Sequence, residues 1–249
     1  MRIAFDLDGV VADLHTAYAQ AALRVFPELD PKAVTSPEIG ASAPDPELDR
    51  AEEPAAAVMP APEALALTRE QSDAVWRQLA AVENFWETLT EIEPGAVATL
   101  GRLADEHGWE VLFVTSRPRS AGSTVQRQSQ RWLQARGFQM PSVYVVRGSR
   151  GEIAKALEID VVVDDRPENC LDVVLDSKAG AILVWRSGKE SVPASARRMG
   201  IAVVSSVQAC LDALTDIEQP EDRRGLFDRL RRVIGLRTSG AHLRHKAHL

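Results

Sequence analysis

The chain has 249 residues, of which 45% are hydrophobic, and its formal net charge is −7 at pH 7. This length and apolar content suffice for one large domain with a small inserted one. The acidic balance argues against general nucleic-acid binding by the body of the protein. The sequence starts directly in an apolar segment, and no apolar run approaches the length of a membrane span, so we expect no signal peptide and a cytoplasmic location. The two cysteines have no metal-ligand spacing, which agrees with a reducing compartment.

The first predicted element is a short apolar strand over residues 2–6, and it runs into the sequence Asp6-Leu7-Asp8-Gly9. Side chains alternate along an extended backbone, so Asp6 and Asp8 point the same way. Gly9 permits the sharp turn with which the chain leaves the sheet. The alternative interpretation of this pattern is a plain turn with solvated acids.

Two amphipathic helices are predicted before the next strand, over residues 11–26 and 68–89, with Thr68 as the N-cap of the second. Between them, residues 27–67 are rich in Pro, Ala and acidic residues. That composition breaks helices and favours extended or disordered chain. Residues 27–67 are therefore either a featureless linker or a mobile insert within a separate helical unit.

From residue 96 onward, predicted helices alternate with predicted strands. The helices are 96–107, 121–136, 151–157 and 168–176, and the strands are 110–115, 142–146, 160–164, 181–185 and 201–204. This alternation predicts an α/β fold, a doubly wound parallel sheet covered by helices on both faces. Ligands bind such sheets at the carboxyl ends of the strands, which is where Asp6, Thr115 and Asp164 fall.

The acids at the ends of strands 2–6 and 160–164 predict a metal site. Clustered carboxylates repel one another unless a cation lies between them, and hard oxygen ligands favour Mg²⁺. We expect the ligands to be Asp6, Asp8, Asp164 and Asp165. A carboxylate such as Asp6 can attack phosphorus and form an aspartyl-phosphate, while Asp8 can protonate the leaving alcohol and then deprotonate the attacking water. Mg²⁺ would neutralise the repulsion between this nucleophile and an anionic phosphate.

The C-terminal segment, residues 219–249, differs in charge from the rest of the chain. From residue 222 onward it holds eight Lys or Arg and two acidic residues. Its apolar residues fall on one helical face: Leu226, Phe227, Leu230, Val233 and Ile234. Such a basic amphipathic helix can bind an anionic membrane surface or dock on the acidic body of the protein. The alternative is an ordinary terminal helix with a solvated basic face.

The strand-end acids resemble the first and last motifs of the haloacid dehalogenase superfamily of phosphohydrolases. The second motif of that superfamily is a Thr or Ser after the next core strand, and here Thr115 and Ser116 stand there. The resemblance implies that both bind phosphate oxygens, while a helix cap is the alternative for Thr115. The third motif is normally a Lys at the start of the helix before the Asp-Asp strand. This sequence has Arg150 at that place, with Lys155 more than a turn later, and Arg can bind a phosphoryl group bidentately.

Within the superfamily, the sequence is similar to the 5'(3')-deoxyribonucleotidases. The segments that carry this resemblance are 83–89, 94–96, Thr115-Ser116, Arg147 with Arg150, and 164–167. The resemblance implies a helical cap inserted after the first strand. Phe85 and Trp86 would then lie where the cap meets the core and flank an aromatic base, with Arg147 as a further substrate contact. Plain core packing is the alternative for the two rings.

Together these observations predict a Rossmann-like core at 1–12 and 93–218, a helical cap at 13–92 containing the insert at 27–67, and a basic tail at 219–249. The expected function is Mg²⁺-dependent hydrolysis of a phosphomonoester, with a (deoxy)ribonucleoside monophosphate as substrate. One alternative is a phosphatase for a non-nucleotide metabolite or a phosphorylated polymer end. Another is a binding or regulatory protein that keeps the fold without turnover.

Overall fold

The structure, a computed structural model, describes residues 1–29 and 67–217. Most of the predicted insert at 27–67 and the basic segment at 219–249 lie outside the described residues, so both stay predictions. Within the described ranges, no helix combines the length and the apolar character needed to cross a membrane.

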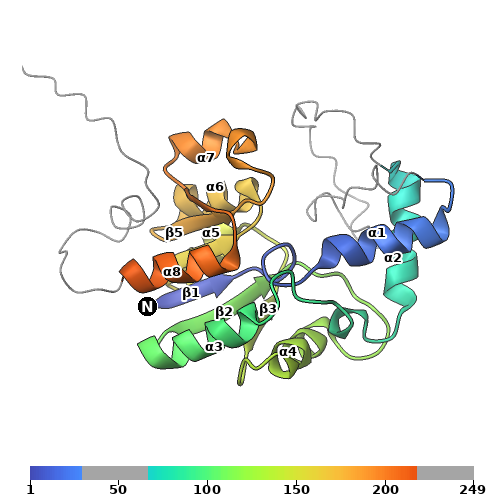
Figure 1. Cartoon of the computed structure of the whole chain (residues 1–249), viewed down its shortest axis with the longest axis horizontal. Helices are drawn as coiled ribbons and strands as arrows, with labels where there is room; N and C mark the ends of the chain where they lie inside the picture. The colour runs from blue at the N-terminus through green and yellow to red at the C-terminus, as the bar shows by residue number, and fades with distance from the viewer. Residues whose placement is uncertain (30–66, 218–249) are drawn as a thin grey trace, which may run out of the picture.

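A parallel six-stranded sheet forms the centre of the described structure (Figure 1). Its strands are β1 (Arg2–Phe5), β2 (Glu110–Thr115), β3 (Ser142–Val145), β4 (Val161–Asp164), β5 (Gly180–Val184) and β6 (Ala202–Val204). Their order across the sheet is β3-β2-β1-β4-β5-β6, and all neighbours pair in parallel. The chain therefore winds from β1 to one edge and then, from β4, to the other. The predicted doubly wound parallel sheet is confirmed.

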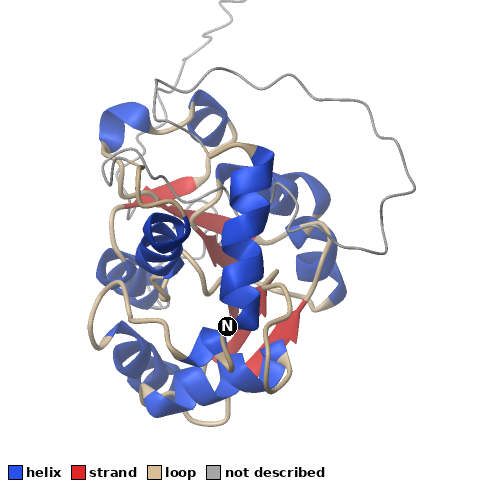
Figure 2. Ribbon diagram, turned by 90° about the vertical axis from the view of Figure 1, so that its right-hand side faces the viewer, coloured by secondary structure: helices blue, strands red, loops and turns tan. Residues whose placement is uncertain are grey.

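Helices cover both faces of the sheet (Figure 2). On one face lie α3 (Ala96–His107), α4 (Val125–Ala135) and α8 (Val207–Ile217), and on the other α5 (Arg150–Ala156), α6 (Pro167–Asp176) and α7 (Ala194–Arg198). Phe5 and Val163 belong to the core of the first face, and Ala4 and Val162 to that of the second. Alternate residues of the central strands are thus buried on opposite faces, which explains their unbroken apolar sequences.

Helices α1 (Leu14–Val25) and α2 (Arg69–Ala81) lie to one side of the sheet and pack on each other (Figure 1). The rings of Tyr18 and Trp76 are 5.4 Å apart, and the Tyr18 hydroxyl donates to Ser72 Oγ at 3.0 Å. Both helices fall in the segment expected to form a cap. An antiparallel bridge between Ala12 and Glu91 joins the two chain segments that lead to and from this helix pair.

The helix predicted over 68–89 is shorter than expected. Thr68 forms the capping box with Gln71, but the helix ends at Ala81. Asn84 has a left-handed φ of 52°, and a short 3₁₀ turn, η1 (Phe85–Glu87), follows it. The Asn84 N–H donates to the Ala121 carbonyl at 2.8 Å, and the Asn84 side chain accepts from the Ser123 N–H at 2.8 Å. Contacts with the loop after β2, which no local pattern shows, end the helix.

Candidate active site

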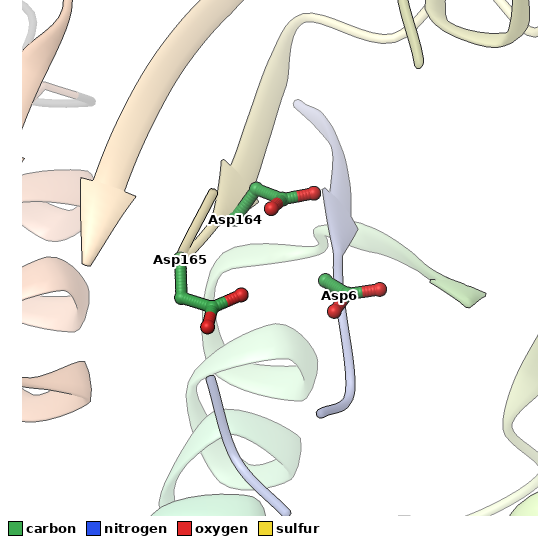
Figure 3. Close-up of side chains that lie close together, drawn as sticks. All are labelled: Asp6, Asp164 and Asp165. Carbon is green, nitrogen blue, oxygen red and sulfur yellow. The ribbon is translucent and has the colours of Figure 1, made fainter. Parts of the chain in front are cut away.

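Three carboxylates meet at the carboxyl ends of the neighbouring strands β1 and β4 (Figure 3). Asp6 directly follows β1, Asp164 is the last residue of β4, and Asp165 follows it. Each offers one oxygen within 4.8 Å of the others. The Asp6 N–H still donates to the Val163 carbonyl, at 2.9 Å, so the sheet ladder itself fixes the position of this acid. Two short apolar strands thus bring together acids that are far apart in the sequence.

Burial makes this cluster costly to ionise. Burial, reinforced by Asp164, raises the pKa of Asp6 well above its ordinary value, while Arg150 opposes the shift. Burial also raises the pKa of Asp164, and Arg150 again opposes it. Burial and the neighbouring Asp164 raise the pKa of Asp165 to about 7. A positive charge among the three acids would reverse these shifts, because it stabilises the ionised forms.

The donor set fits Mg²⁺. It consists of carboxylate oxygens, the hard ligands that this ion prefers. Oδ1 of Asp165 is buried and has no hydrogen-bond partner among the described residues, so it is available to a cation. Both oxygens of Asp164 accept from Asn169 Nδ2, at 3.0 and 2.9 Å, and Oδ1 also accepts from the Arg166 N–H. Asn169 therefore holds this carboxylate in place, as outer partners of metal ligands commonly do.

Asp8 does not join the cluster, unlike the prediction. Its carboxylate is bound on both oxygens by Arg117, which donates from Nε to Oδ2 at 2.8 Å and from Nη2 to Oδ1 at 2.7 Å. Thr115 Oγ1 donates to the same Oδ2 at 3.4 Å. The expected four-acid metal site is thus a three-acid cluster in this structure, because Arg117 pairs with both carboxylate oxygens of Asp8.

Arg150 lies where the resemblance places the third motif, at the first position of α5. It is buried, and its Nη2 donates to Ser116 Oγ at 3.1 Å and to Asp6 Oδ1 at 3.3 Å. Its Nε and Nη1 have no hydrogen-bond partner among the described residues, although Nε lies 3.6 Å from Asp164 Oδ2. Lys155 is exposed on the same helix. Two unused, buried N–H groups next to Asp6 are suited to an anionic ligand.

A pocket of about 370 Å³ opens over the cluster. Its floor includes Asp6, Asp8, Asp165, Thr115, Ser116 and Arg150. Its walls come from the start of α1, the start of α6 and the segment after β5: Leu14, His15, Arg166, Pro167, Glu168, Asn169, Trp185 and Pro193. The structure thus brings the predicted catalytic and phosphate-binding residues together at one opening.

Phe85 and Trp86 do not line this pocket. They are 4% and 1% exposed, and their rings lie edge to face at 4.9 Å. The Trp86 indole N–H donates to the Pro118 carbonyl at 3.0 Å, and its backbone N–H to Gln128 Oε1 at 3.1 Å. The geometry favours core packing over base binding for both rings. Arg147 is exposed and also lies outside the pocket lining.

The site also contains residues that were not predicted from the sequence, among them Arg117, Asn169 and Trp185. Arg117 comes two residues after Thr115 at the end of β2, so alternation along the chain places it on the Thr115 side. Asn169 lies in the first turn of α6, five residues after the acid that it binds. Trp185 directly follows β5, at the same edge of the sheet as the acids. Position at a carboxyl strand end was the available signal for both Arg117 and Trp185.

No family model matches the sequence, and no curated protein matches it. A hydrolase from Pseudomonas syringae has a similar solved structure, with a TM-score of 0.50 and 18% identity, over 88% of this chain and 100% of its own. A protein from Thermotoga maritima assigned as a beta-phosphoglucomutase has a TM-score of 0.49 and 16% identity, over 86% of this chain and 98% of its own. At 18% identity, the first likeness shows a shared fold, and the activity must be argued from the site.

Proposed function

We propose that this protein is a Mg²⁺-dependent phosphomonoester hydrolase of the haloacid dehalogenase type. The observation that carries the proposal is that Asp6, Asp165 and Arg150 line one pocket, while the buried Asp164 completes the acid cluster beside them. Acids alone would suggest a cation site, and an arginine alone an anion site. Both together are what a phosphate ester with a bound metal ion requires.

In the proposed reaction, an oxygen of Asp6 attacks phosphorus, and the bond from phosphorus to the ester oxygen breaks. Asp8 gives its proton to the departing alcohol. In the second step Asp8 takes a proton from a water molecule, which attacks the aspartyl-phosphate and releases inorganic phosphate with free Asp6. Two difficult displacements at an anionic centre are thus each assisted by a carboxyl group that lies in the pocket lining.

The remaining residues of the floor bind and orient. Arg150 donates its unused N–H groups to the phosphoryl oxygens, and Thr115 and Ser116 offer hydroxyl groups at the same place. Asp164 and Asp165 would hold Mg²⁺ together with Asp6. When bound, the ion supplies positive charge that reduces the repulsion between the Asp6 carboxylate and the phosphate.

We further propose a nucleoside monophosphate as the substrate, with its base at the pocket wall and not between Phe85 and Trp86. The pocket wall contains Trp185, a half-buried aromatic side chain whose indole N–H donates to Ser191 Oγ at 3.0 Å, in the 3₁₀ turn η2 (Lys189–Ser191). This bond holds the indole at the opening, where its ring can stack on a flat group. A non-nucleotide phosphate ester is the second candidate, because Glu168 and His15 at the wall also suit a polar leaving group.

A phosphate-release assay tests both the proposed hydrolase activity and the proposed nucleotide substrate. Purified protein with Mg²⁺ is incubated with nucleoside 5'- and 3'-monophosphates, sugar phosphates and oligonucleotides with a phosphorylated end. We expect release from at least one nucleoside monophosphate, and loss of release in excess chelator that is restored by Mg²⁺. Release from sugar phosphates alone would support the proposed phosphomonoester hydrolase activity but contradict the proposed nucleotide substrate.

The Asp6→Asn variant is the control, because the amide has nearly the volume of the acid but cannot form the aspartyl-phosphate. Turnover should fall by at least about a thousandfold with an unchanged melting temperature. If the wild type releases no more phosphate than Asp6→Asn on every ester, the protein is a non-catalytic binding protein, and the proposed function is wrong.

A further inference from the structure

Arg117 is the buried charged residue that the proposed reaction does not itself use. Its side chain is 0% exposed, and that of Asp8 is 4% exposed. The two guanidinium nitrogens that face Asp8 each donate to a different carboxylate oxygen, at 2.8 and 2.7 Å. This bidentate arrangement fixes the plane of the carboxylate as well as its position, since the guanidinium is rigid and flat.

The guanidinium is itself held from two further directions. Its Nη1 donates to Ser129 Oγ on α4 at 2.9 Å. Its carbon atom lies 4.7 Å from the centre of the Trp86 ring, at cation–π distance. Trp86 is anchored by hydrogen bonds to Pro118 and Gln128. Arg117 therefore has little freedom to move, and the buried Trp86 has a function other than base binding, because its ring lies against this arginine.

The arrangement separates the acids of the site into two groups. Asp6, Asp164 and Asp165 form the cation cluster, whereas both oxygens of Asp8 are occupied by Arg117. Without an anchoring cation of its own, a fourth carboxylate at this sheet edge would be drawn to the metal ion. A carboxyl group that coordinates the ion could no longer exchange a proton with a leaving alcohol or with water.

We propose that Arg117 is a positioning residue that aims Asp8 at the leaving-group oxygen and keeps it out of the metal site. The inference rests on the proposed phosphatase function. Both oxygens of Asp8 accept from Arg117, and Asp8 lines the pocket, so the orientation that the guanidinium imposes also fixes how this carboxyl group faces a bound ester. Arg117 thus acts through Asp8 and touches neither the substrate nor the metal ion.

The test compares two substrates that differ in their need for a proton donor. An alkyl phosphate such as glycerol phosphate expels a basic alkoxide, which must be protonated, whereas acetyl phosphate expels a stable carboxylate, which need not be. The quantity measured is kcat/KM, since it reports on the steps up to formation of the aspartyl-phosphate and is unaffected by the later hydrolysis. For Arg117→Gln, we expect kcat/KM to fall by roughly 10²–10⁴ with the alkyl ester, the usual range for loss of acid–base assistance. With acetyl phosphate it should fall less than about tenfold.

Asp8→Asn should show the same selective loss, because both variants remove the aimed proton donor. Arg117→Lys should recover part of the alkyl-ester activity, as it keeps the charge but not the bidentate contact. Arg136→Gln is the matched control. Arg136 also lies over a tryptophan, 4.1 Å from the Trp132 ring centre, but contacts none of the acids of the site. Its ratio of activities on the two esters should equal that of the wild type.

Equal losses on both esters in Arg117→Gln, or the same change of ratio in Arg136→Gln, would overturn the positioning role and leave the hydrolase in place. A wild type that hydrolyses neither ester nor any nucleotide would overturn the hydrolase and this inference together. Melting temperatures of all variants are measured alongside. If Arg117→Gln does not fold, Arg117→Lys is compared with Arg136→Gln instead. A selective loss of kcat/KM on the alkyl ester in Arg117→Lys alone supports the inference. An unchanged ratio of kcat/KM on the two esters in Arg117→Lys contradicts it.

Discussion

Gly9 follows Asp8 in the turn after β1 with a φ of 80°, in the left-handed region that favours glycine. A methyl group at this position would lie 1.9 Å from Oδ2 of Asp165. The turn and the close approach of Asp165 therefore both require glycine. Gly9 thus lets the chain leave the sheet after Asp8, and it also leaves room for the Asp165 side chain beside the turn.

Trp185 is the residue at which the nucleotide hypothesis can be tested. Trp185→Ala should raise KM for a nucleoside monophosphate by roughly tenfold or more, since stacking on an aromatic ring contributes on the order of 1–3 kcal/mol per base. The kcat/KM for glycerol phosphate, which has no ring to stack, should stay within about twofold, because a residue that contacts only the base leaves the reaction of a ring-free ester unchanged. Steady-state kinetics on the two esters provide the measurement.

Trp76→Ala serves as the control for the loss of a tryptophan, because Trp76 lies on α2 against Tyr18 and outside the pocket lining. It should leave the ratio of the two kinetic constants unchanged. A Trp185→Ala enzyme that loses activity equally on both esters would instead indicate that the indole supports the loop around η2, and the base would have to bind elsewhere.

At the scale of the elements, the strands were predictable because each is a short run rich in apolar and β-branched residues, and β1, β4 and β5 are buried on both faces. The acids Asp6, Asp164 and Asp165 could be predicted with them, since strand ends fix where such residues lie. The ion pair between Asp8 and Arg117 could not, because it joins residues 109 positions apart and depends on how β1 and β2 align. The end of α2 was missed for the same reason.

The segments around the site are tied together by Arg186 and Glu93. Arg186 donates to the carbonyls of Gly9 and Val10, at 2.6 and 3.1 Å, and to Glu93 Oε1 at 2.8 Å. The Glu93 carboxylate in turn accepts from the backbone N–H of Val207 at the start of α8, at 2.8 Å. The turn that carries Asp8 is thus anchored to the segment after β5, to the segment before α3 and to α8, which holds Asp8 in a fixed position relative to the sheet.

The packing of α5 on α6 predicts a sharp difference between two helical glycines. A methyl group at Gly151 would lie 2.2 Å from the Asp172 carbonyl oxygen, so Gly151→Ala should force α5 away from α6 and displace Arg150 at its first position. Overpacking of this kind costs about 1–3 kcal/mol, or about 2–4 °C in melting temperature for each kcal/mol in a chain of this size. Phosphatase activity should fall with it, because Arg150 moves.

Gly101→Ala is the matched control, since the same substitution in α3 meets its nearest atoms, in Gly137 and Phe138, at 3.4 Å. It should be neutral or stabilise the protein by up to about 1 kcal/mol, as alanine favours the helix. Thermal unfolding and phosphate release of the two variants are compared. Similar melting temperatures for both would show that α5 and α6 can separate without cost, and the account of Arg150 placement would then be wrong.

For the molecule as a whole, the parallel sheet gathers acidic side chains at the carboxyl ends of its strands, because parallel strands all end on the same side of the sheet. The folded chain therefore binds protons that the unfolded chain releases. Asp165 has a pKa of about 7 in the folded protein, against an ordinary value of 3.8, and the pKa values of Asp6 and Asp164 are raised as well. A group whose neutral form is favoured by folding destabilises the fold once it ionises.

The sign of the resulting pH dependence is fixed. Between pH 4 and pH 7 the folded state holds more protons than the unfolded state, so the contribution of Asp165 to the free energy of unfolding falls as the pH rises through this window and stays low above it. Without metal, the wild type should melt at a lower temperature at pH 8 than at pH 5. The melting temperature of Asp165→Asn, whose amide cannot ionise, should fall by less between pH 5 and pH 8.

Mg²⁺ binds the ionised cluster, so it should raise the wild-type melting temperature at pH 8 much more than at pH 5, where protons compete for the same oxygens. Parallel pH profiles for the two proteins, together with no response to Mg²⁺ at pH 8, would show that the three carboxylates do not form a cation site.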